Sequence, residues 1–269
     1  MHPFVRVASQ AARKASEVIT RGWRDIDILR VEQKSPNDYV TTIDRAAEEI
    51  LVEEISARFP DHGFIGEEFG QKGPKDAEVV WIIDPLDGTT NFINGISKFA
   101  ISIGCQVKGR MEHGLIYDPI MDEEFSASRG QGSRLNGKRL RVREQKTLQG
   151  ALLATGIPFS QDSMEHLGAY FALTEELVRH STAGIRRLGA ASLDLAYVAA
   201  GRFDGYYEMN LKPWDIAAGT LIVREAGGLV TDLAGDSNFM KSGHILCATP
   251  KLMREMLPIV RRHLGYLNS

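Results

Sequence analysis

Residues 79–90 of the chain read Val79-Val80-Trp81-Ile82-Ile83-Asp84-Pro85-Leu86-Asp87-Gly88-Thr89-Thr90. Its apolar half has the length and the β-branched content of a strand that is buried on both faces. Because proline cannot extend a hydrogen-bonded ladder, we expect the chain to turn where the acids begin. Asp84 and Asp87 would then lie together at the rim of a sheet.

The residues that follow the two acids suit an anion. Gly88 has no Cβ to keep a phosphate from the backbone, and Thr89-Thr90 can begin a helix whose free N–H groups attract negative charge. Carboxylates and the exposed carbonyl of Leu86 are hard oxygen ligands of the kind that Mg²⁺ prefers. The stretch therefore indicates a metal held against a phosphate ester, whereas an isolated Asp-rich turn would merely cap a helix.

Length and composition are those of a globular protein that buries a sizeable core, with 269 residues, 43% hydrophobic and 25% charged. The net charge of −3 gives no overall attraction to nucleic acid or to an anionic membrane. Cys105 and Cys247 lie in apolar runs, so we expect core residues and a reducing, cytoplasmic location. No run in the sequence approaches the roughly 20 apolar residues of a membrane span.

Apolar spacing predicts an amphipathic helix over residues 4–19 and a second helix over 42–59, with a polar loop at 34–38 between them. A polar connection is expected at 71–78. Residues 99–128 read as a meander of antiparallel strands, and Asn136-Gly137 predicts a two-residue hairpin. Strands and helices then alternate. We expect layered α and β structure, with a mixed antiparallel half (1–144) and a more α/β half (145–269).

Three further acids stand where packing gives little reason for charge: Glu67, Asp44 and Asp215. Glu67 lies in a glycine-bounded loop, and the other two open predicted helices. Each alone has a simpler explanation, because an acid in the first turn offsets the helix dipole and either Glu67 or Glu68 could merely be solvated. Their convergence with Asp84 and Asp87 is the argument for a site.

Rival chemistries fit the sequence less well. Residues 132–138 match the first seven positions of a phosphate-binding P-loop, but Arg139 stands where a Ser or Thr would hold Mg²⁺. The Asn-Gly hairpin explains this segment better. The sequence has no G-x-S-x-G elbow of a serine hydrolase, and His244 with Cys247 forms only an H-x-x-C pair, too little for zinc.

Three segments resemble the signatures of the inositol monophosphatase family in order and spacing, over nearly the whole chain: Gly66-Glu67-Glu68, DPLDGTTNF at 84–92 and Trp214-Asp215-Ile216-Ala217-Ala218-Gly219. Met1-His2-Pro3, Arg186-Arg187 and residues 191–201 resemble a bacterial branch of that family. The resemblance implies an α+β fold, the layered αβαβα sandwich of the inositol monophosphatase and fructose-1,6-bisphosphatase type. It also implies a single phosphatase domain over residues 1–269 and a homodimer.

The resemblance also implies residue roles. Glu67, Asp84 and the Leu86 carbonyl would hold one Mg²⁺, Asp84, Asp87 and Asp215 a second, and a weaker third ion would lie near Glu67. Thr89, supported by Asp44, would orient the attacking water. The amides of Gly88 and Thr89 would bind phosphate. Lys34 would approach the first metal, and Glu208, Gly189 and Ala190 would line the substrate hydroxyls, with Asp215 beside them. Between Gly156 and Ser160 the resemblance does not identify which residue contacts the substrate.

The implied activity is a Mg²⁺-dependent, lithium-sensitive phosphomonoesterase acting on inositol-1-phosphate or a similar small polyol phosphate. Fructose-1,6-bisphosphate, histidinol phosphate and 3′-phosphoadenosine 5′-phosphate are alternative substrates, because the metal chemistry is shared. The bacterial branch further implies a role in transcription antitermination and ribosome biogenesis, with RNA polymerase or antitermination factors as partners.

Within this acidic chain one segment is basic, and it is the candidate surface for such a partner. Residues 129–146 carry seven Lys and Arg against Glu144 alone. In strand geometry Arg139, Arg141 and Arg143 would project from one face. A solvated edge strand, charged to prevent pairing with other strands, is the alternative.

Overall fold

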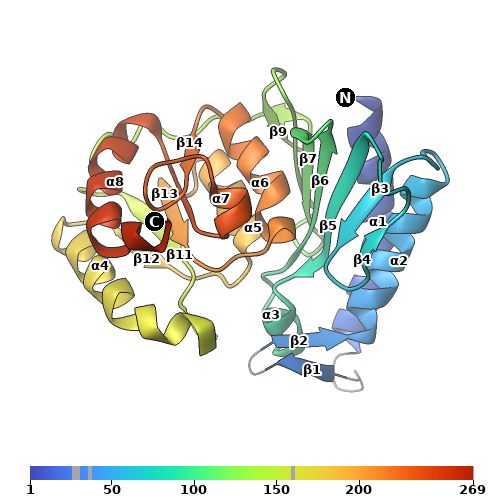
Figure 1. Ribbon diagram of the computed structural model, residues 1–269, viewed down its shortest axis with the longest axis horizontal. Coiled ribbons are helices and arrows are strands. Elements are labelled where there is room, and N and C mark those ends of the chain that lie inside the picture. The colour runs from blue at the N-terminus through green and yellow to red at the C-terminus, as the bar shows by residue number, and fades with distance from the viewer. Residues whose placement is uncertain (26–30, 36–37, 159–160, 269) are drawn as a thin grey trace.

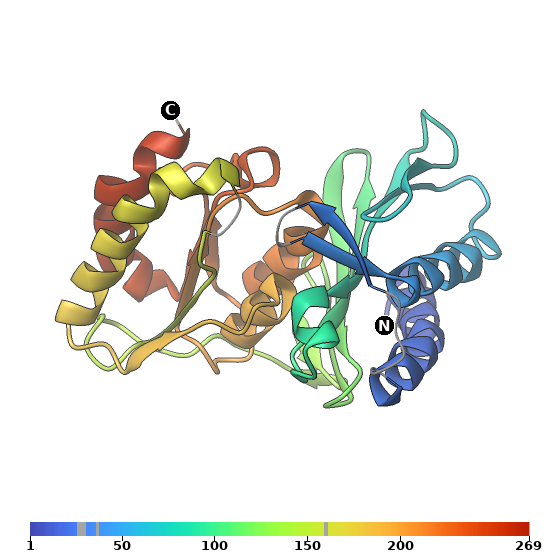
Figure 2. The same ribbon diagram turned by 90° about the horizontal axis from the view of Figure 1, so that it is seen from below.

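The computed structural model describes residues 1–269 apart from 26–30, 36–37, 159–160 and 269. Figure 1 shows two sheets side by side, with helices between and outside them. The layers follow one another in Figure 2 as α1 (Pro3–Arg24) with α2 (Thr42–Ser56), the larger sheet, α5 (Ala191–Ala199) with α6 (Pro213–Glu225), the smaller sheet, and α4 (Leu167–Arg179) with α8 (Pro250–Leu264). The expected αβαβα sandwich is confirmed.

The larger sheet has the order β10-β9-β8-β7-β6-β5-β3-β4 among the described strands, and only the β3–β5 pair is parallel. The strands are β3 (Gly63–Gly66), β4 (Gly70–Lys72), β5 (Val79–Asp87), β6 (Ala100–Val107), β7 (Arg110–Asp118), β8 (Glu123–Ser128), β9 (Ser133–Leu135) and β10 (Lys138–Arg139). The predicted meander and hairpin are confirmed, since Asn136 and Gly137 take φ of 48° and 80° between β9 and β10.

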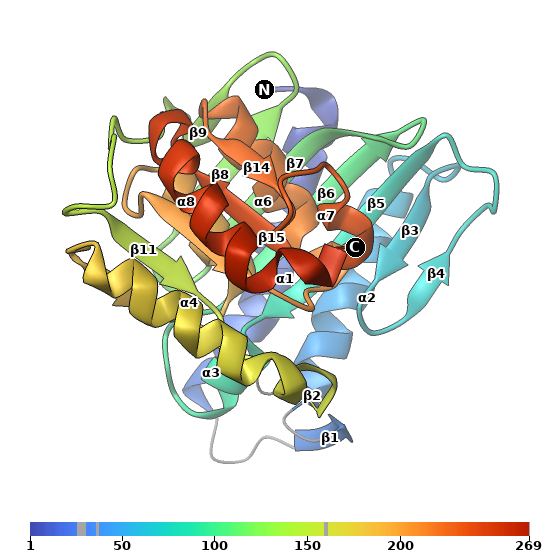
Figure 3. The same ribbon diagram turned by 60° about the vertical axis from the view of Figure 1, so that its left-hand side comes forward.

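The smaller sheet has the order β12-β11-β13-β15-β14, parallel across its first three strands and antiparallel across the rest. Its strands are β11 (Leu152–Thr155), β12 (Gly184–Arg186), β13 (Gly205–Glu208), β14 (Leu229–Thr231) and β15 (Ile245–Ala248). In Figure 3, α4 and α8 lie in front of this sheet. Shorter elements are β1 (Val31–Ser35), β2 (Asp38–Thr41), α3 (Thr89–Ile93), α7 (Phe239–Ser242) and two 3₁₀ helices (Gln161–His166 and Gly265–Asn268).

Strand alternation divides the buried side chains among the layers. In β13, Tyr206 joins the core around α5 and α6, whereas the next residue, Tyr207, joins the core beneath α4 and α8. In β6, Ile101 and Ile103 face the core beneath α1 and α2. Successive strand residues point to opposite faces, so each sheet is apolar on both sides, as the sequence of β5 indicated.

The expectation of a turn at Pro85 is wrong, because β5 continues to Asp87 through a bulge. Asp84 pairs with Ser102 but Asp87 pairs with Ala100, so β5 has one residue more than β6 in this interval. Bulges tolerate a proline because the ladder is already interrupted there. In regular alternation Asp84 and Asp87 would face opposite sides of the sheet; the extra residue brings both carboxylates to the side of α5 and α6 and turns Leu86 into the opposite core.

Two predicted polar segments also contain strands. β1 and β2 pair across the expected loop at 34–38, of which residues 36–37 lie outside the described part. β4 begins the segment expected as a polar connection and pairs with β3 at the sheet edge. All three residues of β4 are exposed, so it lacks the apolar alternation by which a strand is recognised in sequence.

Glycines let α6 lie unusually close to the larger sheet. A Cβ built on Gly104 of β6 would lie 2.8 Å from the Cβ of Ala217, and one on Gly114 of β7 would lie 2.8 Å from the carbonyl oxygen of Ala218. The two glycines are cross-strand partners, so together they form a flat patch beneath the helix. This close packing fixes the position of the first turn of α6, which carries Asp215.

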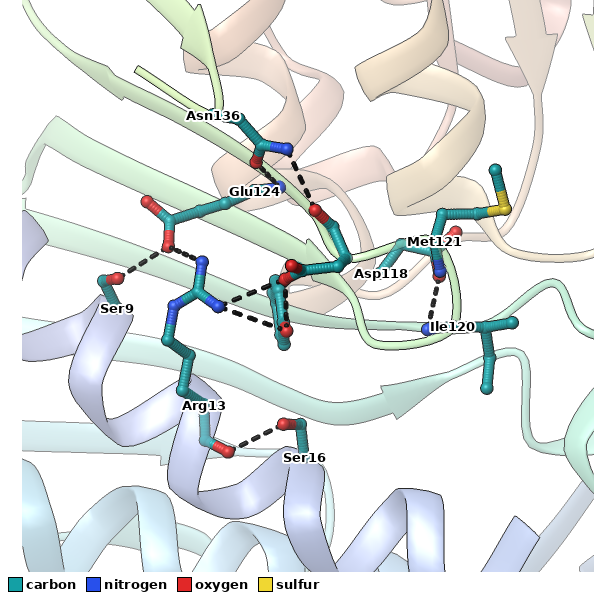
Figure 4. A network of polar contacts seen from close by, with 10 residues as sticks. Ser9, Arg13, Ser16, Asp118, Ile120, Met121, Glu124 and Asn136 are labelled. Atoms are coloured by element: carbon teal, nitrogen blue, oxygen red, sulfur yellow. Dashed lines mark hydrogen bonds and ion pairs between the residues drawn. The ribbon is translucent and has the colours of Figure 1, made fainter. Parts of the chain in front are cut away.

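The opposite face of the sheet is tied to α1 by a polar network (Figure 4). The Arg13 guanidinium donates to Asp122 Oδ1 at 3.1 Å and to Glu124 Oε2 at 3.3 Å, and Ser9 Oγ donates to the same Glu124 oxygen at 2.6 Å. Asp118 Oδ1 accepts two backbone N–H bonds in the turn between β7 and β8. Since Arg13 is about half exposed, this network orients α1 more than it stabilises the fold.

We predict that Gly114→Ala lowers the free energy of unfolding by about 1–3 kcal/mol, because the added methyl meets backbone that cannot move aside. Gly168→Ala is the matched control, since a Cβ on that residue of α4 has nothing within 4 Å and alanine favours the helix by about 0.5–1 kcal/mol. Urea unfolding of both variants measures the effect. Equal stability of the two would contradict the close packing of α6.

Candidate active site

Asp84 and Asp87 lie at the end of β5 and are almost fully buried, with 2% and 9% of their surface exposed. The backbone N–H of Leu86 donates to Asp84 Oδ1 at 2.9 Å. Both the N–H and the hydroxyl of Ser192, in the first turn of α5, donate to Asp87 Oδ2, at 2.7 and 2.5 Å. These bonds hold one oxygen of each carboxylate in place.

Asp215 reaches the same place from the first turn of α6. Its Oδ2 accepts the backbone N–H of Lys212 at 2.7 Å. Ser102 lies opposite Asp84 in the β5–β6 register and donates its hydroxyl to the carbonyl of Trp214 at 3.0 Å. One side chain therefore connects the strand beside Asp84 to the residue before Asp215.

Glu67 enters from β3, the parallel neighbour of β5. Its backbone N–H donates to the carbonyl of Ile83 at 3.2 Å, immediately before Asp84. The side chains of Glu67 and Glu68 are both half-buried, so exposure alone does not separate the two. The backbone bond places the loop of Glu67 at the carboxyl end of β5.

The acids at this edge repel one another. Burial, followed by the charges of Glu67, Asp87 and Asp215, raises the pKa of Asp84 well above its ordinary value. Burial raises the pKa of Asp87 to about 6 although Ser192 stabilises its charge. Burial and the charge of Asp87 also raise the pKa of Asp215. The structure therefore brings together four of the five acids that the sequence singled out, at a cost in free energy that a bound cation would offset.

Thr89 and Asp44 are in direct contact, as expected. The Thr89 hydroxyl lies 3.0 Å from Asp44 Oδ1 and 3.1 Å from the Leu86 carbonyl. The other Asp44 oxygen accepts the N–H and the hydroxyl of Thr41, the N-cap of α2. Burial raises the pKa of Asp44, and these hydrogen bonds partly offset the effect. Asp44 thus caps its helix and holds Thr89 at once.

Gly88, Gly189 and Ala190 are also brought together. Gly88 has φ +97°, and a Cβ there would lie 2.8 Å from the carbonyl of Lys98 and 3.3 Å from the Cβ of Ala190. The Asn91 side chain donates to the carbonyls of Lys98 and Leu188, at 2.7 and 2.8 Å. The segment before α5 is thereby held against the turn that follows Asp87, where only glycine fits at position 88.

Glu208 belongs to the same region and is not a solvated strand end. Tyr206 donates its hydroxyl to Glu208 Oε2 at 2.5 Å, and a Cβ on Gly156 would lie 1.8 Å from Glu208 Oε1. Burial, with a contribution from the charge of Asp87, raises the pKa of Glu208 to about 7. Gly156 belongs to the segment in which the sequence left the substrate contacts open; residues 159–160 lie outside the described part.

The donor set fits a hard divalent cation. Asp84, Asp87, Asp215 and Glu67 offer carboxylate oxygens, and protein donors orient the first three. Among the described residues no group of three His, Cys, Asp or Glu is arranged so that it could hold a metal ion. The fit therefore rests on the chemistry of these oxygens.

Sequence reasoning missed the residues that hold the acids in place. Ser192, Ser102, Asn91 and Glu48 all bond to the site or to its loops. The available signals were weak: Glu48 follows Asp44 by one helical turn, and Ser192 follows closely after Gly189-Ala190. The side chain of Lys34 lies outside the described part of the structure.

The basic strand is shorter than expected. β10 ends at Arg139. The Leu140 N–H still bonds to Ser133 of β9, and the chain then turns to the end of α6, where the Val142 N–H bonds to Ala226. Leu140 and Val142 nevertheless pack on the core, so Arg139, Arg141 and Arg143 remain exposed, as alternation predicted. Arg143 also lies 3.7 Å from the buried Asp204.

Comparison with known proteins gives one consistent picture. The model of the inositol monophosphatase family matches residues 1–264. The Nus factor SuhB of Pseudomonas aeruginosa is 49% identical over 266 residues, which are 98% of each chain.

Two solved structures are similar throughout. The extragenic suppressor protein SuhB of Bartonella henselae is 40% identical, with a TM-score of 0.93 over 98% of this chain and 100% of that one. An inositol monophosphatase of Anabaena is 35% identical, with a TM-score of 0.84 over 98% of both chains. None of the described helices has the length and apolar character of a membrane span.

We predict that, without divalent cations, Asp84→Asn makes the protein more stable at pH 8, because it removes a buried charge that the neighbouring acids repel. Asp84 has a higher pKa in the folded state than in the unfolded state, where it is about 4. Between these two pKa values the folded state binds more protons. The stability of the unaltered protein therefore falls as the pH rises from about 4 to the folded-state pKa. An amide keeps the bond from Leu86 and removes the charge.

Urea unfolding between pH 4 and pH 8 in chelator measures this effect, and the variant should give the flatter profile. Thr42→Ala, at an exposed position of α2, controls for the handling of the samples. A variant less stable than the unaltered protein at pH 8 would contradict the repulsion described above.

Proposed function

The chain belongs to the inositol monophosphatase family, and on that premise we propose that it is a Mg²⁺-dependent phosphatase of a small polyol phosphate, with inositol-1-phosphate as the best single substrate. The observation that carries the proposal is the convergence of Asp84, Asp87 and Asp215 on one side of the larger sheet. Asp84 and Asp87 come from residues 1–144 and Asp215 from 145–269, so we propose that both halves form one phosphatase domain.

The proposed ligands divide into two sets. Glu67, Asp84 and the Leu86 carbonyl would hold the first Mg²⁺, and Asp84, Asp87 and Asp215 the second, with a third ion near Glu67. Bound Mg²⁺ would supply a water activated at neutral pH and positive charge at the leaving oxygen. Buried carboxylates that repel one another in the absence of a cation support this assignment.

The proposed role of Thr89 is to orient the attacking water. Its single hydroxyl proton is directed to Asp44 Oδ1 or to the Leu86 carbonyl. The lone pairs of its oxygen are then available to accept a hydrogen bond from water on the opposite side. Asp44, which is itself fixed by Thr41, prevents the hydroxyl from turning away. The amides of Gly88 and Thr89 would bind the phosphate.

Substrate hydroxyls are proposed to meet Glu208, Gly189 and Ala190, with Asp215 beside them. Glu208 is held by Tyr206 and packs on Gly156, so its carboxylate has a fixed direction. A fixed acceptor selects a polyol over an ester without hydroxyls. Fructose-1,6-bisphosphate, histidinol phosphate and 3′-phosphoadenosine 5′-phosphate remain the alternative substrates, because they differ only in this part of the site.

We predict Mg²⁺-dependent hydrolysis of inositol-1-phosphate in a panel with the three alternative esters and an aryl phosphate. Glu208→Ala should weaken the transition-state stabilisation of polyol phosphates by about 1–3 kcal/mol and leave the aryl phosphate nearly unchanged. Initial rates over a range of substrate concentrations measure both effects. Asp84→Asn is the inactive reference.

Two outcomes would count against the proposal. Hydrolysis by Asp84→Asn at saturating Mg²⁺, with a kcat close to that of the unaltered protein, would remove the metal assignment. An equal loss on all esters in Glu208→Ala would make Glu208 a structural residue.

A second candidate function is association with RNA polymerase or antitermination factors in the bacterial cytoplasm. It is favoured by the exposed side chains of Arg139, Arg141 and Arg143, supported from beneath by Leu140 and Val142. The name Nus factor of the bacterial relatives agrees with it. The arginines continue from β10 at one edge of the larger sheet, whereas the acids lie at the end of β5, so the two functions would use different surfaces.

We predict that Asp84→Asn keeps the association with RNA polymerase, whereas Arg139→Glu with Arg141→Glu and Arg143→Glu loses it but remains an active phosphatase. Because Arg143 lies near the buried Asp204, a version without the third substitution guards against unfolding. Lys251→Glu with Arg254→Glu, at exposed positions of α8, controls for net charge. Pull-down from bacterial extract measures the association. If the charge-reversed variants still associate with RNA polymerase, the arginines do not form the binding surface.

A further inference from the structure

A carboxylate that neither the sequence motifs nor the proposed chemistry uses lies beneath the loop of Glu67. Glu48, in the second turn of α2, is only 1% exposed. Its Oε2 accepts the backbone N–H of Glu68 at 2.8 Å, and its Oε1 accepts that of Phe69 at 3.1 Å. Burying a carboxylate costs free energy, so this residue requires an explanation.

The loop is shaped around this carboxylate. A Cβ on Gly66 would lie only 2.0 Å from Glu48 Oε1, so position 66 admits no side chain while Glu48 occupies its place. Three successive amides are also fixed: that of Glu67 bonds to Ile83 of β5, and those of Glu68 and Phe69 bond to Glu48. Glu67 is therefore held between β5 and α2.

The position of Glu48 on α2 extends this arrangement to the rest of the site. Glu48 lies four residues after Asp44, so the two buried carboxylates lie one above the other on the same face of the helix. Asp44 holds Thr89, and Glu48 holds the backbone around Glu67. One face of α2 therefore holds two segments of the site: the turn that carries Thr89 and the loop that carries Glu67.

We propose that Glu48 is a positioning residue for the cation site, which fixes the Glu67 carboxylate against Asp84 through the backbone of residues 66–69. This inference rests on the proposed function, because it assumes that Glu67 binds Mg²⁺. Removing a residue that orients a metal ligand typically costs about 10–100-fold in metal affinity. Glu48 does not touch the substrate, so its loss acts through the occupancy of the site by metal.

The test compares Glu48→Gln with Glu49→Gln, a matched change on the exposed neighbour in the same helix. Mg²⁺ binding is measured by isothermal titration calorimetry, and amide hydrogen exchange is followed at Glu68 and Phe69. We expect Glu48→Gln to bind Mg²⁺ about 10–100-fold more weakly and to exchange both amides faster. Its kcat at saturating Mg²⁺ should stay close to that of the unaltered protein, and Glu49→Gln should change nothing.

Gly66→Ala tests the same contact from the loop and should weaken Mg²⁺ binding in the same direction, which keeps the test decisive if Glu48→Gln folds poorly. Glu67→Gln is the reference for loss of the ligand itself. If Glu67→Gln weakens Mg²⁺ binding and both Glu48→Gln and Gly66→Ala leave it unchanged, the positioning role is wrong. If Mg²⁺ binds neither the unaltered protein nor any variant, the proposed function fails instead.

Discussion

The acids of the candidate site repel one another, and the elements around them are arranged to hold them in place. Asp84 and Asp87 lie within a few residues of each other on one strand, and Asp215 and Glu67 raise the local negative charge further. Acids so placed would separate or protonate unless the surrounding structure held them. Each is therefore bonded through the backbone or by a side chain from another element, and the layers meet where these bonds are made.

Two features of backbone geometry make that meeting possible. The bulge at Pro85 turns Asp87 to the same side as Asp84, where Ser192 of α5 can reach it. Glycines on β6 and β7 then let α6 approach the sheet closely enough to bring Asp215 to the same point. The same device recurs at smaller scale, since two carboxylates near the site, Glu48 and Glu208, each pack directly on a glycine. Each glycine leaves the space that the carboxylate occupies.

The arrangement separates the reacting end of the site from the end that would select a substrate. The acids, Thr89 and Asp44 are attached to the larger sheet and to α2, which belong to the first half of the chain, except for Asp215. Glu208 belongs to the smaller sheet, where Tyr206 directs it. Under the proposed function, substitutions around the smaller sheet would change the substrate preference and leave the cation site intact.

Elements with local signals could be predicted from the amino-acid sequence. The Asn136-Gly137 hairpin, the amphipathic α1 and the apolar β5 were predicted because turn chemistry and apolar period act within a few residues. The family motifs also identified the acids of the candidate site, and the structure brings these together.

The way in which those acids are held depends on contacts that form only in the folded chain. The bulge at Pro85 depends on register with β6, and the exposed strand β4 exists only because β3 pairs with it. Glu48, Ser192 and Gly156 are ordinary residues in the sequence, because their roles come from partners 20, 105 and 52 residues away along the chain. Contacts between distant segments leave no periodic pattern in either segment. They can therefore be identified only in the folded structure.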